Sequence, residues 1–96
     1  MDKRKILDKL EEFYNMDEVK AGFSSQDACI EWSNKVAPLL KFNNQYYINF
    51  MQNAHKMNLG LSAQSIIPAF KIMRSQVQMA IEELKSEIDN NEEPVT

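Results

Sequence analysis

Two residues could supply nucleophilic or acid–base chemistry, and each type occurs once among the 96 residues. His55 is the single imidazole, the side chain best suited to exchanging protons near neutral pH. Cys29 is the single thiol, and the spacing of its apolar neighbours places it on the buried stripe of a helix. There a thiol packs as a small hydrophobe with a raised pKa. We therefore expect both residues to be structural and predict no catalytic residues.

The sequence also lacks the spacings that hold metals or phosphates. It contains no Cys-x-x-Cys and no His-Glu-x-x-His, and its isolated glycines cannot form a phosphate-binding loop. Acidic residues near the C-terminus fall at helical spacing on a solvated face, without the Glu-x-x-His partners of a di-iron bundle. We therefore predict no metal site, no cofactor and no enzymatic activity.

The composition is that of an ordinary globular domain, with 44% hydrophobic and 26% charged residues. Two glycines and three prolines are too few for the many chain reversals of a β-sandwich or barrel. The lone cysteine excludes an intramolecular disulfide. Because the sequence has neither an apolar run of about 18 residues nor a secretory signal, we expect a cytoplasmic protein that does not enter membranes.

Hydrophobic spacing is helical almost throughout, and it predicts four helices. Their expected bounds are 3–20, 25–40, 44–59 and 65–89. Short connections favour antiparallel neighbours, so the predicted fold is all-α, a small antiparallel bundle. The apolar stripe of the first helix weakens after Met16, which leaves open a break near Asn15. One helical domain is expected over residues 1–89, with a frayed, disordered tail over 90–96.

Local signals set the expected helix ends in the first half of the chain. Asp2 is a suitable N-cap for the first helix, and Gly22 supplies a left-handed residue that ends it. Ser24, followed three residues later by Asp27, has the spacing of a first-turn cap for the second helix. Pro38 cannot continue that helix, so it should open a tilted turn that carries the next two leucines into the core.

The second half of the chain carries similar signals. Asn43 or Asn44 is the expected N-cap of the third helix. Ser62 or Ser65 is the expected N-cap of the fourth. With Ser65 as the cap, Pro68 falls in the first turn, where its missing N–H has no helical partner to lose.

Charge is distributed unevenly along the chain. Residues 1–31 hold eight acids and five bases, and residues 82–96 hold six acids and one base. Residues 32–81 contain five bases and no acid. A solvated helical surface normally intersperses both signs. The acid-free segment is therefore the one feature that rises above background.

Two interpretations of this segment are open. Carboxylates from the terminal segments could pair with the central cations inside the fold, or the segment could form one weakly basic face. Such a face, rich in amides and aromatic residues, suits a protein partner with an acidic or apolar surface. We therefore expect a non-enzymatic protein-binding module, such as an adaptor, an inhibitor or a regulatory partner. Its candidate partner-binding residues are Lys35, Lys41, Tyr46, Asn49, Asn53, Lys56, Lys71 and Arg74.

Two alternatives remain. The same face could serve a nucleic-acid-associated regulator, with Tyr46 stacking on a base, although a net charge of −3 argues against it. A self-assembling protein is the other alternative, with a homodimer formed through Leu84 and Ile88 at an overhanging end of the fourth helix. Large apolar residues are more numerous than a small core needs, which predicts a hydrophobic groove or a self-association surface.

Overall fold

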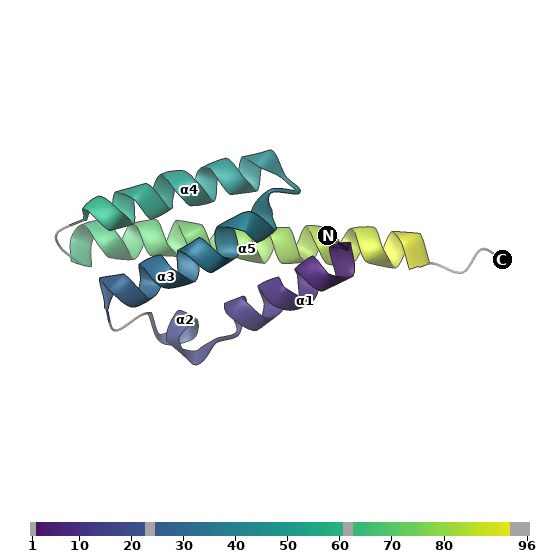
Figure 1. The fold of residues 1–96 in the computed structure, drawn as a ribbon, viewed down its shortest axis with the longest axis horizontal. Helices are drawn as coiled ribbons and strands as arrows, with labels where there is room; N and C mark the ends of the chain where they lie inside the picture. Colours follow the sequence, from purple (N-terminus) through teal and green to yellow (C-terminus); the bar gives the residue numbers. More distant parts are fainter. Residues whose placement is uncertain (1, 23–24, 61–62, 93–96) are drawn as a thin grey trace.

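The computed structural model describes residues 2–22, 25–60 and 63–92, and within these ranges it contains helices and no strands (Figure 1). The predicted all-α fold is therefore confirmed. In chain order the elements are α1 (Lys3–Tyr14), α2 (Asp17–Ala21), α3 (Gln26–Val36), the 3₁₀ helix η1 (Ala37–Leu40), α4 (Asn44–Leu59) and α5 (Ala63–Glu92). No described helix combines the length and the apolar character needed to cross a membrane.

The long helix α5 is the scaffold on which α1 and α4 pack (Figure 1). Its 30 residues correspond to about 45 Å at 1.5 Å per residue, against a longest molecular dimension of 56 Å. The helix α4 runs antiparallel to α5 from the loop at Gly60, and α1 runs antiparallel along its C-terminal half. Between α1 and α4 lies α3, which contacts both.

The first helix, expected over 3–20 with a possible break near Asn15, does break there and forms two helices, α1 and α2. Asp2 caps α1 as predicted, its side chain accepting from the backbone N–H of Arg4 at 3.3 Å. At the other end, the side-chain amide of Asn15 donates to the carbonyl of Glu11 at 2.9 Å. The backbone N–H of Asn15 donates to the same carbonyl at 3.0 Å, so Asn15 is the C-cap with which α1 ends. The following Gly22, with φ of 77°, ends α2.

The N-cap of α3 is Ser25, not the predicted Ser24, which lies outside the described residues. The Ser25 hydroxyl accepts from the backbone N–H of Ala28 at 3.1 Å, the three-residue reach that an N-cap requires. After Val36 the chain tightens into η1, which contains Pro38 near its start. Both leucines that follow are buried, so the predicted turn is confirmed.

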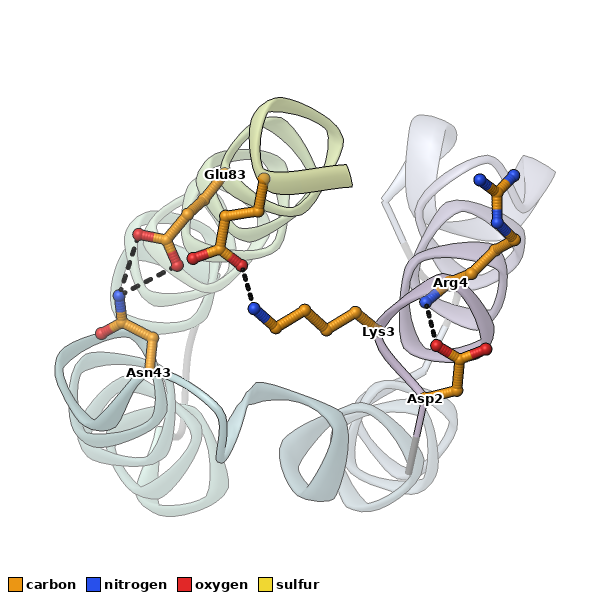
Figure 2. Close-up of polar contacts among 6 residues, drawn as sticks. Asp2, Lys3, Arg4, Asn43 and Glu83 are labelled. Carbon is orange, nitrogen blue, oxygen red and sulfur yellow. Dashed lines mark hydrogen bonds and ion pairs between the residues drawn. The ribbon is translucent and has the colours of Figure 1, made fainter. Parts of the chain in front are cut away.

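The helix α4 has its predicted bounds, and Asn43 is its N-cap. The Asn43 side-chain oxygen accepts from the N–H groups of Gln45 at 3.0 Å and Tyr46 at 3.4 Å. Its amide nitrogen donates to both carboxylate oxygens of Glu83 at 3.3 Å, which ties the start of α4 to α5 (Figure 2). One side chain thereby caps one helix and fixes its position on another.

The start of α5 differs from the expectation. The helix begins at Ala63, so Ser65 lies inside it and is not its cap, while Ser62 lies outside the described residues. Pro68 is therefore inside α5, where it provides no N–H for the carbonyl of Gln64. At its other end, α5 continues to Glu92 and includes the first three residues of the expected tail.

The core is centred on Trp32, which is 3% exposed. Its indole packs against Phe50 at 5.8 Å and edge-on against Phe70 at 5.6 Å between ring centroids. The indole N–H donates to the carbonyl of Phe13 at 3.2 Å. One side chain on α3 thus contacts residues of α1, α4 and α5, and this convergence closes the bundle.

The homodimer contact expected at Leu84 and Ile88 is not supported. Leu84 is fully buried and Ile88 is partly buried against the core. The reason is that α1 covers this part of α5, and ion pairs from Lys3 to Glu87 (3.1 Å) and from Glu11 to Lys85 (3.6 Å) flank the contact. Figure 2 shows Lys3 extending from α1 toward α5. The expectation that Leu84 is free to meet a second copy was therefore wrong.

Candidate functional site

A cavity of about 560 Å³ opens between α2, the first turn of α3 and the N-terminal half of α5. This volume lies within the usual range for ligand pockets. Most of its exposed lining is apolar, and the apolar residues are Val19, Ala21, Cys29, Ile66, Ile67 and Phe70. The sequence predicted a hydrophobic groove or a self-association surface, and the structure contains such an opening.

The cavity exists because α1 stops short of the N-terminal half of α5. The hydroxyl of Tyr14, the last residue of α1, donates to Gln78 at 3.4 Å. Beyond it the chain turns into α2, which is anchored by the fully buried Val19. On α5, Ile67 lines the cavity and remains 52% exposed, a high fraction for an isoleucine in a bundle.

The apolar wall of the cavity is the outer surface of the core. Phe70 lines the cavity and is the same ring that packs edge-on against Trp32. Cys29 is 3% exposed, and its thiol lies 2.9 Å from the sulfur of Met57. Burial raises the pKa of the Cys29 thiol to about 11. The thiol stays protonated at neutral pH, so it contributes apolar surface instead of a thiolate nucleophile.

Three cations line the same cavity: Lys20 from α2, and Lys71 and Arg74 from adjacent turns of α5. Within the described residues, none of the three forms an ion pair with a carboxylate. The Arg74 guanidinium lies 5.4 Å from the centroid of the Tyr14 ring, a cation–π contact that orients it. Its Nε is buried and has no hydrogen-bond partner among the described groups. Because this N–H is buried, Arg74 lines the cavity through the other atoms of its side chain.

The remaining central cations lie on other elements. Lys35 and Lys56 are exposed on α3 and α4. Lys41, directly after η1, lies 5.7 Å from the centroid of the Tyr47 ring. Of the five central cations, Lys71 and Arg74 line the cavity and the other three do not. Ion pairs among the described residues join α1 to α5 and include none of the central cations, so direct pairing with terminal carboxylates is not seen there.

The three polar candidates on α4 do not line the cavity. Asn53 is 8% exposed, and its side-chain amide donates to the carbonyl of Asn49 at 2.8 Å, so little of it can reach a partner. Tyr46 is half-buried beside carboxylates of α5. Its pKa is raised by burial first, and then by the negative charges of Glu83 and Glu82.

The sequence-based candidate set missed Lys20 and Ile67. Lys20 lies outside the acid-free segment, and the candidate residues were chosen from that segment, so Lys20 was not among them. Two features of the sequence could have indicated it: the apolar stripe is interrupted at Asp17, and Gly22 is left-handed. Together they mark the two ends of α2. A cation between two such breaks belongs to a short separate helix, and that placement brings Lys20 to the cavity.

Residues with potential for chemistry do not converge on this cavity. His55 is exposed on α4, whereas Cys29, a residue of α3, is buried. Across the part of the chain that the structure describes, no three His, Cys, Asp or Glu side chains are arranged to hold a metal ion. Comparisons with protein-family models, with curated proteins and with solved structures each gave no match to this chain.

Proposed function

We propose that the protein is a non-enzymatic helical module that binds an acidic, partly apolar segment of another protein in the cavity between α2, α3 and α5. One observation carries this proposal: Lys20, Lys71 and Arg74 surround an apolar cavity and lack a carboxylate partner among the described residues. A ligand with both apolar surface and negative charge satisfies both parts of such a site.

The two parts of the site have different roles. Apolar contact with Ile67 and Phe70 supplies most of the affinity, because burial of apolar surface is the main favourable term in association. Cations at the edge accelerate encounter and select acidic partners. Arg74 should dominate among them, because a hydrogen bond to a charged group contributes about 1.5–3 kcal/mol. The exposed lysines should each contribute about 0–1 kcal/mol.

Nucleic acid fits the described surface less well than protein does. Tyr46, the expected stacking residue, lies beside Glu83 and Glu82, whose charges would repel a phosphate backbone. Single-strand sites combine stacking aromatics with a basic groove that follows the backbone. Here Lys35, Lys41 and Lys56 lie on separate elements and do not line the cavity.

A cytoplasmic location is part of the same proposal. Its support is Cys29, a free thiol packed beside Met57, since reducing compartments keep thiols unpaired. The site chemistry fits an adaptor, an inhibitor or a regulatory partner equally.

The test is site-specific crosslinking from the cavity. A photo-crosslinking amino acid replaces Ile67, whose side chain is half exposed, so the fold should tolerate it. The full chain is then irradiated in a native lysate treated with nuclease. We expect a crosslinked protein whose yield falls at least tenfold when Lys71→Glu and Arg74→Glu are added.

The matched control is Lys35→Glu with Lys56→Glu, which makes the same charge change on α3 and α4 and should leave the yield intact. An equal yield from both double variants would contradict the proposal. Loss of the crosslinked species on nuclease treatment would favour the nucleic-acid alternative instead.

A further inference from the structure

The helix α1 is itself an amphipathic helix bound to α5, and its 12 residues carry four bases and three acids. Leu7 and Leu10 bury its apolar face in the core. Glu11, on the turn that holds Leu10, forms an ion pair with Lys85 of α5 at 3.6 Å. Lys3 of α1 pairs with Glu87 of α5 at 3.1 Å, so the molecule contains one example of an amphipathic helix held on α5 by ion pairs of both polarities.

The face of α5 that α1 contacts continues past the end of α1. Tyr14 closes the contact at Gln78 and Arg74. One turn further toward the start of α5 lies Lys71, and the next turn presents Ile67. Lys85, Gln78, Arg74, Lys71 and Ile67 are separated by seven, four, three and four residues, which places them along one stripe of the helix.

The last part of this stripe, from Arg74 to Ile67, lines the cavity. Its opposite wall is formed by α2 and the first turn of α3, which contribute Val19 and Cys29. The cavity thus continues the side of α5 that carries Lys85, beyond the end of α1. The helix α1 covers α5 near Lys85, whereas no described helix covers the part of α5 that lines the cavity.

We infer that this cavity takes a short acidic amphipathic helix of a partner protein, docked on α5 end to end with α1. The inference rests on the proposed function and adds the shape and charge pattern of the partner segment. Leucine-like side chains spaced three or four residues apart contact Ile67 and Phe70. Carboxylates one turn along contact Lys71 and the Arg74 guanidinium, as Glu11 contacts Lys85.

Synthetic peptides of about four turns test this directly with the full chain. One peptide has leucines at helical spacing and glutamates at the polar positions, and its match has lysines there. Trp32, the only tryptophan, reports binding by fluorescence because Phe70 joins it to the cavity. We expect the glutamate peptide to bind, and the lysine peptide to bind at least tenfold more weakly.

Charge reversal supplies the specific control. Lys71→Glu with Arg74→Glu should exchange the preference, so that the lysine peptide becomes the tighter ligand. Lys35→Glu with Lys56→Glu should leave the original preference unchanged. Because Arg74 contacts Tyr14, thermal melting checks the fold, and Lys20→Glu with Lys71→Glu is a second reversal that leaves that contact in place.

Two results would overturn the inference. Equal binding of a glutamate peptide with scrambled leucine positions would mean that charge alone attracts it and no helix face is recognised. Tighter binding of a simple alkyl carboxylate such as dodecanoate would assign the cavity to a small amphipathic anion. If either occurs while the Ile67 crosslink still depends on Lys71 and Arg74, the proposed function stands and only the helical partner is rejected.

Discussion

Truncation of Trp32 tests whether the bundle closes around this side chain. Trp32→Ala removes a 3% exposed indole that contacts Phe50 and Phe70 and donates to the carbonyl of Phe13. Large aromatic truncations in cores cost about 3–5 kcal/mol, and the lost hydrogen bond adds about 1 kcal/mol. The expected loss in free energy of unfolding is therefore about 4–6 kcal/mol.

This loss is large on the scale of the protein. A chain of this length has a stability of about 5–14 kcal/mol at typical per-residue values, so Trp32→Ala should be close to unfolded or much destabilised. Trp32→Phe is the matched variant, because it keeps an aromatic ring between Phe50 and Phe70 and removes the N–H donor. Its expected cost is about 1–2 kcal/mol.

Urea denaturation followed by far-ultraviolet circular dichroism measures both variants, since neither retains the tryptophan for fluorescence. Both variants lose the hydrogen bond to Phe13, so the difference between their free energies of unfolding measures the packing of the aromatic ring alone. If Trp32→Ala costs no more than Trp32→Phe, the indole does not join α1, α4 and α5, and the description of the core fails.

Three further predictions concern other parts of the fold. Asn43→Ala should lower the free energy of unfolding by about 1–2 kcal/mol, because it removes the cap of α4 and the contact with Glu83. The neighbouring substitution Asn44→Ala should lower it little. Equal losses for the two variants in urea denaturation would refute the role of Asn43 as the cap. Because the folded Cys29 pKa is raised to about 11, stability should fall as pH rises from about 9 to 11, by up to about 2 kcal/mol. Unfolding of Cys29→Ala across that range should show a smaller loss, and an identical slope would exclude the thiol. Leu84→Ala should lower the free energy of unfolding by about 2–5 kcal/mol and leave the sedimentation coefficient unchanged. If the wild-type protein sediments as a dimer and the variant as a monomer, the self-assembly alternative is restored.

Helix ends could be predicted where a single residue determines them. Asn43 fixes the start of α4 through its own side chain, and Pro38 fixes the end of α3 through its missing N–H. Both effects are local, so the sequence alone reveals them. The start of α5 was predicted wrongly because a proline removes one backbone hydrogen bond without always ending a helix, and Pro68 lies inside α5.

The candidate site was only partly predictable, for a related reason. A run of residues without acids describes position along the chain, but successive helical residues point in every direction around the axis. Lys71 and Arg74 share a side of α5, whereas Lys35 and Lys56 lie on other helices. Lys20 reaches the cavity only because the chain breaks after Tyr14 and Val19 anchors α2 in the core.

Lysine footprinting of the complex with the crosslinked protein tests the binding site most directly. The full chain, alone and bound to that protein, is acetylated briefly, and each lysine is quantified by mass spectrometry. If the cavity is the binding site, Lys20 and Lys71 become protected while Lys35 and Lys56 react at unchanged rates. Protection of Lys35 and Lys56 with continued reaction of Lys20 and Lys71 would place the partner elsewhere and contradict the proposed site.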